Sequence, residues 1–259
     1  MMIKKAPRIL AFDGDTVVKE ALARIEQPAR RLFLTRSLTL GGLSLLTGCA
    51  IVDENDVEHA LMKVSRFNDK VQAWLFDPKL LAPTYPESMI ARPFPFNAYY
   101  GEDEVREVDA ASYRLEVSGM VADKHAWTLP ELQALPQTDQ ITRHICVEGW
   151  SAIGKWGGVR FSDFLARVGA DTSAKYIGFK CADDYYTSID MPTALHPQTL
   201  LTLTYAGQPL PPKYGFPMKL RMPTKLGYKN PKHIQAIFVT NTYPGGYWED
   251  QGYNWFGGS

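Results

Sequence analysis

The sequence predicts a mixed α+β fold in which strands dominate, and three observations lead to this class. Several short segments carry the apolar patterns of strands, whereas the candidate helices between them are brief. The 259 residues, of which 45% are hydrophobic, suffice for a sizeable core in one large domain or two small ones. No internal repeat or low-complexity run is present.

Residues 1–48 form a basic leader with eight Lys/Arg and four Asp/Glu. Arg30 and Arg31 precede an apolar segment, residues 38–46, that is too short to span a bilayer. The paired arginines resemble a twin-arginine export signal, and the run Leu-Thr-Gly-Cys ending at Cys49 resembles a lipobox. An amphipathic helix with two chance arginines is the alternative. We expect an exported, periplasmic protein that contacts the membrane through a lipid anchor on Cys49.

Beyond the leader the chain is mildly acidic, with 20 basic and 24 acidic residues, which argues against nucleic acid as a partner. If Cys49 carries a lipid, two cysteines remain, and in an oxidising compartment a disulfide between Cys146 and Cys181 is one alternative. The histidines lie far apart in sequence, so their spacing does not predict a zinc site.

Residues 49–92 are predicted to be a linker and an N-terminal segment that wraps the core, with a helix between Val52 and Arg66 before several prolines break regular structure. The domain proper is assigned to residues 93–259. The expected strands are Tyr113–Val117, Gln140–Cys146, Tyr176–Cys181, Thr199–Tyr205 and Ile234–Thr240.

Two short helices interleave with these strands. The spacing of Thr128 and Glu131 predicts a capping box, and Ser162 with Asp163 predicts the start of a helix that ends at Gly169.

The most informative stretch is Arg143–Trp150, RHICVEGW. Cys146 stands at the end of an apolar strand, and the glycines that follow are typical of a turn where backbone approaches a large ligand: Gly149, Gly154, Gly157 and Gly158. A thiolate there is a candidate ligand for a soft metal, and a packing cysteine is the alternative. Glu148 is a candidate to orient a water or a proton. We expect His144 to point away from Cys146.

Several segments, taken in order, resemble the molybdenum–pterin oxidoreductases of the sulfite oxidase fold, in particular members similar to the periplasmic methionine-sulfoxide reductase catalytic subunit. The match extends over roughly residues 94–256. It consists of a pterin-contacting segment at 96–100, a metal-ligand loop at 143–150 with 156–159, a stretch leading to the pterin at 196–200 with 207–210, an anion-binding strand and loop at 214–219 and 226–232, and a closing segment at 246–253.

The resemblance implies a strand-dominated fold of the sulfite oxidase type, with Cys146 as the protein ligand to molybdenum in a molybdenum–molybdopterin cofactor. Besides Cys146, the implied cofactor contacts are Asn97, Tyr100, Gly101, Cys181, Tyr214, Lys219, Lys229 and Lys232. A depressed thiol pKa in a positive loop would keep Cys146 ionised. Tyr214 and Lys219 depart from the family pattern, in which His or Asn and Arg respectively are usual.

The implied activity is two-electron oxygen-atom transfer to or from a small molecule, with Cys146 and Glu148 as the catalytic candidates. Three cations near the cysteine, Arg143, His144 and Lys155, are few for the dianion sulfite, so sulfoxide or N-oxide reduction is favoured over sulfite-type oxidation. Trp150, Trp156, Tyr185 and Tyr186 are the candidates for an aromatic wall.

No haem-attachment C-x-x-C-H motif is present, so we expect electrons to pass through a separate membrane or periplasmic partner linked to cytochromes or quinones. Two other classes of function stay open. One is a cofactor-free binding lipoprotein held by the Cys146–Cys181 disulfide, and the other is a cysteine-nucleophile hydrolase, for which the spacing provides no histidine and carboxylate beside Cys146.

Overall fold

The computed structural model describes the backbone of residues 54–259 and the side chains from residue 59 onward. The chain divides into two units, residues 1–60 and 61–259, and the second unit holds both sheets. Residues 61–92, predicted as part of the linker, belong to this second unit. The predicted export signal and lipobox lie outside the described residues. Within the described range, no helix combines the length and the apolar character needed to cross a bilayer.

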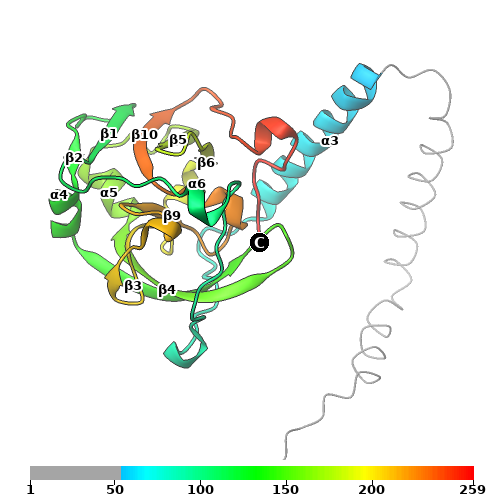
Figure 1. Ribbon diagram of the computed structural model, residues 1–259. Helices are drawn as coiled ribbons and strands as arrows, with labels where there is room; N and C mark the ends of the chain where they lie inside the picture. The colour runs from blue at the N-terminus through cyan, green and yellow to red at the C-terminus, as the bar shows by residue number, and fades with distance from the viewer. Residues whose placement is uncertain (1–53) are drawn as a thin grey trace, which may run out of the picture. The chain divides into compact units, whose positions relative to one another are not determined.

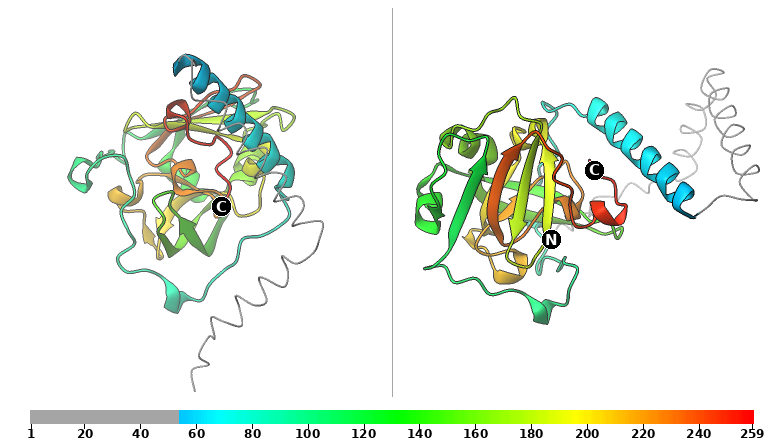
Figure 2. Two further views of the ribbon diagram at one scale, coloured as in Figure 1. Left: turned by 90° about the vertical axis from the view of Figure 1, so that its right-hand side faces the viewer. Right: turned by 90° about the horizontal axis from the view of Figure 1, so that it is seen from above.

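The first sheet has five strands in the order β2-β1-β10-β5-β6 (Figure 1). These are β1 (Arg114–Gly119), β2 (Trp127–Thr128), β5 (Tyr176–Cys181), β6 (Tyr186–Asp190) and β10 (Ile234–Thr240). Strands β1 and β10 are parallel and the other neighbours antiparallel. Figure 2 shows these strands side by side. The predictions for β5 and β10 are confirmed to the residue, and β1 begins one residue later than predicted.

The second sheet runs β3-β4-β7-β8, and β9 also pairs with β7. Its strands are β3 (Gln137–Ile145), β4 (Ser151–Arg160), β7 (Leu200–Tyr205), β8 (Gln208–Pro209) and β9 (Lys219–Arg221). The strands β3 and β4 form a long antiparallel hairpin, paired from Gln137 with Val159 to Ile145 with Ser151. The residues that turn this hairpin are 146–150, so the stretch singled out in the sequence, 143–150, is the end of β3 followed by the hairpin loop.

Strand β4 was not predicted, because its glycines suggested a turn. A side chain at Gly158 would place a Cβ 2.0 Å from the carbonyl oxygen of Leu201 on β7, so glycine is needed there for strands to approach. Gly154 and Gly157 also lie inside β4. The prediction that these three glycines form a ligand-approaching turn is therefore wrong, and Gly149 alone of the four lies in the loop.

The helices are α3 (Glu54–Leu75), α4 (Leu129–Ala134), α5 (Phe161–Arg167) and α6 (Met191–Ala194), with 3₁₀ turns η1 (Glu87–Met89), η2 (Glu102–Glu104), η3 (Pro212–Tyr214), η4 (Gly227–Lys229) and η5 (Glu249–Gln251). The capping box of Thr128 and Glu131 is confirmed at α4. The predicted cap of α5 is wrong: the helix begins at the buried Phe161, so Ser162 lies inside its first turn and Arg160 is the N-cap.

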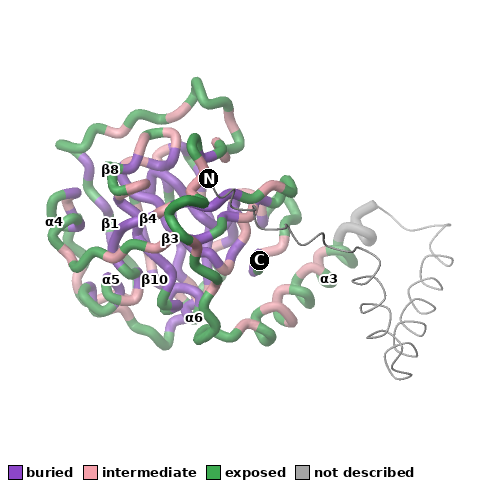
Figure 3. Tube along the Cα trace, turned by 90° about the horizontal axis from the view of Figure 1, so that it is seen from below, coloured by how far each residue is buried: buried purple, intermediate pink, exposed green. Residues whose placement is uncertain are grey.

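The main core lies between the sheets and takes residues from both. Examples are Leu115, Ile177 and Ile237 of the first sheet and Val159 and Leu201 of the second. A smaller aromatic cluster around Phe94 and Trp156 packs elsewhere on the second sheet. Figure 3 shows that the buried residues lie mostly in the part of the molecule that contains the two sheets, whereas α3 is largely exposed. Trp150 of the hairpin loop between β3 and β4 packs against the smaller aromatic cluster.

Candidate active site

Cys146 directly follows β3 and opens the hairpin loop. Its backbone N–H donates to the carbonyl of Trp150 at 2.9 Å, and the Gly149 N–H donates to the carbonyl of Cys146 at 3.1 Å. Gly149 has a φ of +92°, a conformation that favours glycine. The loop is therefore a closed turn that fixes the direction of the Cys146 side chain, which is 4% exposed.

The sulfur of Cys146 has two polar neighbours. The Asn97 Nδ2 donates to Sγ at 3.2 Å, and Sγ lies 3.6 Å from the Glu148 Oε2, which also accepts from the Trp150 Nε1 at 2.9 Å. Burial raises the pKa of the Cys146 thiol, so the predicted depression of this pKa is wrong for the protein alone. A bound metal cation would act in the opposite direction, because coordination deprotonates a thiol.

A cleft with an empty volume of about 690 Å³ opens over Cys146. Segments far apart in the sequence supply its walls. The lining residues are Asn97, Ala98, Tyr99, Cys146, Val147, Glu148, Asp183, Tyr185, Gly227, Tyr228, Asn230, Pro231, Lys232, Trp248 and Tyr253. The cleft therefore has the predicted cysteine in its wall and aromatic rings around it.

Three buried cations lie close together beside the cleft: Lys219 and Arg221 on β9, and Lys232 on the loop before β10. The side chains of Lys232 and Lys219 meet at Gly215. A Cβ built on Gly215 would stand 2.9 Å from the Cβ of Lys232 and 3.2 Å from the Cβ of Lys219. Burial lowers the pKa of Arg221 to about 9 and that of Lys232 to about 8, and burial next to the other two cations lowers the pKa of Lys219 strongly. No ion pair of these three cations with a carboxylate is present among the described residues.

Several buried nitrogen atoms around these cations lack partners. Both ring nitrogens of His144, the Nε of Arg221 and the Nε2 of His233 have no hydrogen bond within the described part of the chain. Buried donors of this kind are costly unless something binds to them. The cluster of Lys219, Arg221, Lys232, His144 and His233, called here the basic cluster, therefore has the composition of an anion-binding site.

Gly227 shows how closely this cluster approaches the cleft. A Cβ at Gly227 would stand 2.7 Å from the Nε2 of His144 and 3.4 Å from the Nδ2 of Asn97. His144 thus lies on the same side of β3 as Cys146, and the prediction that it points away is wrong. Residues two apart on a strand share a face, and Thr142, His144 and Cys146 are all buried while Arg143 is exposed.

Arg221 fixes the position of the two segments that carry the cleft. One guanidinium nitrogen donates to the side chain of Asn230 at 3.2 Å, and the other donates to the carbonyl of Arg143 at 2.5 Å. Asn230 in turn accepts from the backbone N–H of Met222 at 2.7 Å. Strand β9, the end of β3 and the loop after η4 are therefore joined through one side chain.

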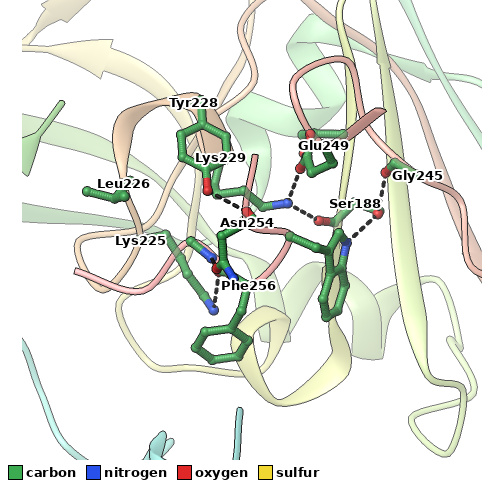
Figure 4. Close-up of polar contacts among 12 residues, drawn as sticks. Ser188, Lys225, Leu226, Tyr228, Lys229, Gly245, Glu249, Asn254 and Phe256 are labelled. Atoms are coloured by element: carbon green, nitrogen blue, oxygen red, sulfur yellow. Dashed lines mark hydrogen bonds and ion pairs between the residues drawn. The ribbon is translucent and has the colours of Figure 1, made fainter. Parts of the chain in front are cut away.

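Lys229 is held differently from the basic cluster, as Figure 4 shows. Its Nζ donates to the carbonyl of Ser188 at 2.7 Å and forms a buried ion pair with Glu249. The hydroxyl of Thr187 donates to the same carboxylate oxygen at 2.7 Å. The Trp255 Nε1 donates to the Ser188 hydroxyl at 2.9 Å. This network fastens the η4 loop to β6 and to the C-terminal segment.

Comparison with known proteins agrees with this geometry. The family model described as the oxidoreductase molybdopterin binding domain matches residues 102–248, more than half of the chain. The chain belongs to this family. It is therefore an oxidoreductase that binds a molybdopterin cofactor, and the resemblance found in the sequence is confirmed.

Two relatives and one solved structure illustrate the match. The chain is 75% identical, over the whole length of both proteins, to a putative protein-methionine-sulfoxide reductase subunit YedZ1 of Azospira oryzae. It is 32% identical to the protein-methionine-sulfoxide reductase catalytic subunit MsrP of Xanthomonas campestris pv. campestris, over 60% of this chain and 56% of that protein. The sulfane dehydrogenase SoxCD of Paracoccus pantotrophus has the same fold, with a TM-score of 0.50 and 20% identity over 53% of this chain and 40% of that one. The fold is therefore the strand-dominated α+β fold of the sulfite oxidase type.

The residues present fit a molybdopterin group. Its phosphate requires cations and free N–H donors, which the basic cluster supplies with nitrogens that have no partner in the described structure. A metal carried by the pterin would take a thiolate ligand, and Cys146 lies in the cleft lining where it could supply one. Of the three lysines predicted for the cofactor, Lys219 and Lys232 lie in the basic cluster. The Lys229 side chain is instead occupied by Glu249 and Ser188.

Tyr100 and its neighbour Tyr99 are tied to the loop between β5 and β6. The Tyr100 hydroxyl donates to the carboxylate of Asp183 at 2.8 Å, and the Tyr99 hydroxyl donates to the Asp183 carbonyl. Burial raises the pKa of Tyr99 to about 12. These bonds place Asn97 over the sulfur of Cys146, and Tyr99 rather than Tyr100 lines the cleft. Gly101 lies outside the cleft lining, where its N–H donates to Glu104 at 2.8 Å.

Tyr214 and Cys181 are not brought to the cleft lining. The Tyr214 hydroxyl binds the backbone of Phe94, donating to its carbonyl at 2.9 Å within the aromatic cluster. Cys181 belongs to the main core, where burial raises its pKa strongly. Both Cys146 and Cys181 are free thiols, so the disulfide considered for the binding-module alternative is not formed.

The surface cations and aromatic residues predicted around the cysteine mostly lie elsewhere. Arg143 stacks on Tyr85, and Lys155 pairs with Glu87 at 2.8 Å on the surface. Four aromatic residues were predicted to form the wall: Trp150, Trp156, Tyr185 and Tyr186. Tyr185 lines the cleft and the other three do not. Tyr99, Tyr228, Trp248 and Tyr253 complete the wall.

Sequence reasoning missed Arg221, His233 and Asp183. Arg221 stands two residues after Lys219, so the alternation of a strand could have indicated a shared site. Asp183 carries the bonds from Tyr99 and Tyr100 but stands in a turn with no motif of its own. His233 has a φ of +50°, and nothing in the sequence around it predicts this.

Proposed function

We propose that this protein is an exported molybdenum–molybdopterin oxidoreductase that reduces sulfoxides by removing their oxygen atom. The observation that carries the proposal is the position of Cys146, bonded by Asn97 and facing an aromatic-walled cleft. Next to it lies the basic cluster, whose lysines and arginine form no ion pair with a carboxylate of the described residues. The names of the relatives support a sulfoxide as the substrate class. N-oxides present the same polar oxygen and are the second substrates to test.

The charges of the cleft favour a neutral substrate over sulfite. The ionisable acids and bases among its lining residues, besides Cys146 and the tyrosines, are Glu148, Asp183 and Lys232. Two carboxylates and one lysine give no excess of positive charge for a dianion. The rings of Tyr99, Trp248 and Tyr253 provide an apolar surface for the carbon groups and sulfur of a sulfoxide.

The overall reaction converts R₂S=O, two electrons and two protons into R₂S and water. The cofactor supplies the two-electron redox change when it is bound. The S–O bond breaks, and Glu148 is placed beside the sulfur of Cys146 to carry a proton toward the departing oxygen. The bond from Asn97 orients Cys146, and the electrons come from a separate redox protein of the cytochrome or quinone-linked class.

Substituting the candidate metal ligand tests the proposal. The Cys146→Ala variant should fold but lose sulfoxide reduction by at least about 100-fold, more than the loss of an outer-shell partner usually causes. Activity is measured with methionine sulfoxide and a reduced viologen dye, on protein made in a host that synthesises molybdopterin. Molybdenum and pterin are measured by elemental analysis and by fluorescence of the released pterin.

The matched control is Cys181→Ala, which removes the other described thiol from the core. This control should keep its activity and its metal content. Near-normal activity of Cys146→Ala would remove the metal-ligand assignment. Sulfite oxidation faster than sulfoxide reduction by the unaltered protein would favour the alternative direction of reaction.

Export and anchoring form a separate part of the proposal, because they rest on residues outside the described structure. Replacing Arg30 and Arg31 together by lysine should leave cofactor-loaded protein in the cytoplasm, whereas replacing the unpaired Arg24 and Arg36 should not. Cell fractionation measures this, and normal export of the first variant would contradict the twin-arginine route.

Loss of lipid labelling in Cys49→Ser tests the anchor. Membranes in which cytochromes and quinones do not alter turnover would contradict the proposed electron partner.

A further inference from the structure

Among the residues whose side chains the structure describes, 59–259, the large exposed hydrophobic side chains are concentrated in one segment, residues 61–81. There the exposed fraction is 64% for Leu61, 57% for Val64, 64% for Phe67 and 82% for Trp74. Leu75, Leu80 and Leu81 continue the series, all more than half exposed. A contiguous apolar surface of this kind marks a site of interaction with a partner or a membrane.

Helix α3 is attached to the body by its other side. Asp69 accepts from the backbone N–H of Phe256 at 2.8 Å, and Gln72 accepts from that of Gly258 at 3.3 Å. Phe76, directly after the helix, packs edge-on against the ring of Phe256. With 100° between successive residues, Asp69 and Gln72 define one side of α3. Val64, Phe67 and Trp74 form an apolar arc that lies about 80° or more around the helix from Gln72, whereas Leu61 lies close to the attached side.

A basic stripe borders the apolar arc. Lys63, Arg66 and Lys70 are exposed and stand three or four residues apart, so they form one line along the helix. The single acidic residue between positions 59 and 76 is Asp69, which is turned toward the body. Between residues 61 and 75 the free surface of α3 is therefore apolar on one side and positively charged beside it, whereas the first turns of the helix carry Glu54, Asp56 and Glu58.

We propose that α3 lies in the surface of an anionic lipid bilayer, with the apolar residues between 61 and 75 among the acyl chains and the basic stripe at the headgroups. A helix that combines an apolar face, a Lys/Arg face and a tryptophan has the composition of an interfacial helix. Trp74 prefers the boundary between headgroups and acyl chains. A second copy of this chain is the other occupant that the test below separates, because the acidic start of α3 in an antiparallel partner would meet the basic stripe.

This inference goes beyond the proposed activity and does not depend on a lipid anchor. Residue 49 precedes the helix by five residues, which span at most about 18 Å when extended, so an anchor there would keep α3 close to the bilayer. The helix is bonded to residues 256–258, and Tyr253 of the same C-terminal segment lines the cleft. Docking of α3 would therefore place the cleft a short distance from membrane-bound redox partners.

The test uses the full chain carrying Cys49→Ser, so that no lipid modification contributes. Vesicles of phosphatidylglycerol and phosphatidylcholine, in a roughly 3:7 ratio, mimic an anionic leaflet. Flotation should show binding that weakens about tenfold or more in Phe67→Ser and that is lost in high salt. Exchanging Lys63 and Arg66 for glutamate should weaken binding to the same extent.

Two controls and one local probe make the test specific to α3. Met89→Ser removes an exposed apolar residue elsewhere, and Lys124→Glu reverses an exposed charge elsewhere, so both should bind like the parent. Insertion into the vesicles should shift the emission of Trp74 to the blue, and brominated lipids should quench it. Trp74→Phe should abolish both responses. The proposal is overturned by vesicle binding through the leader alone, with Trp74 unquenched and Phe67→Ser unaffected. It is also overturned by a Trp74 shift that depends on protein concentration without vesicles, which would indicate a second copy.

Discussion

Two sets of buried cations lie within a few residues of each other in the sequence, but only one of them is paired with a carboxylate of the described residues. Lys229 is enclosed with Glu249, and its ammonium also donates to the carbonyl of Ser188. Lys219, Arg221 and Lys232 are buried together, and none of them forms an ion pair with a described carboxylate. Burial lowers the pKa of the lysines in both sets. The directly bonded Glu249 acts in the opposite direction on Lys229, and Asp183 and Glu102 do so on Lys232 without an ion pair, whereas no carboxylate offsets the effect of burial on Lys219.

The difference separates a structural role from a binding role. A buried charge without a counter-charge is expensive, so a fold keeps one where a ligand supplies the missing charge. The basic cluster fits that description, whereas Lys229 has its counter-charge within the chain. We conclude that the basic cluster serves the anionic cofactor and that Lys229 is a positioning residue, which holds the η4 loop beneath the cleft.

The largest expected effect comes from removing the carboxylate of the enclosed pair. Glu249→Ala leaves Lys229 as an uncompensated buried charge, so the free energy of unfolding should fall by about 3–5 kcal/mol. Urea denaturation of the cofactor-free protein measures this. The matched control is Glu87→Ala, which breaks the surface pair with Lys155 and should change stability little. Equal losses in the two variants would show that the enclosed pair contributes nothing special.

A smaller effect of opposite sign is expected in the basic cluster. Lys219→Met removes a buried cation that is close to two others, so the cofactor-free protein should be about 1–2 kcal/mol more stable, while its pterin content falls. Lys229→Met is the matched variant, since it buries Glu249 without its partner and should lose stability. If Lys219→Met were as destabilising as Lys229→Met, the distinction between the two sets would fail.

Strand patterns made much of this fold accessible from sequence. Strands β5 and β10 are rich in β-branched and aromatic residues, and their limits were predicted to the residue. Strand β4 was missed because its glycines serve the close approach of β7, a tertiary requirement that local sequence does not reveal. Cys146 and Asn97 were predicted to lie in one site, and the bond between them agrees.

Other parts of the site depend on contacts between distant segments. Lys219, Lys229 and Lys232 look alike in sequence, and what distinguishes them is Glu249, 20 residues beyond Lys229 and outside any shared motif. The pKa of Cys146 was predicted in the wrong direction, because charges near in sequence, such as Arg143, turn out to the surface while burial dominates at the sulfur. Spacing along the chain cannot show which of two neighbours faces inward when the register is unknown.

Lys225 is a third kind of buried cation and gives the smallest effect. Its Nζ donates to the carbonyl of Phe256 at 2.9 Å and lies over the rings of Phe256 and Phe76, and burial lowers its pKa to about 7. Polar and aromatic contacts thus replace a directly bonded carboxylate. The pH dependence of stability shows whether those contacts compensate for burial as Glu249 does for Lys229.

Between pH 7 and pH 8.5 the folded protein should hold Lys225 increasingly neutral, whereas the unfolded chain keeps it protonated up to a pKa near 10.4. The unfolded state then binds more protons, so the free energy of unfolding should rise with pH, by up to about 1.4 kcal/mol per unit for one group. Lys232, whose pKa is lowered to about 8, adds to the same slope. Urea denaturation of the cofactor-free protein at several pH values should therefore give a steeper slope for the parent than for Lys225→Met, and the exposed Lys180→Met should match the parent. An unchanged slope in Lys225→Met would mean that the carbonyl and the two rings stabilise the ammonium as well as a carboxylate does, and would place Lys225 with Lys229 rather than with the basic cluster.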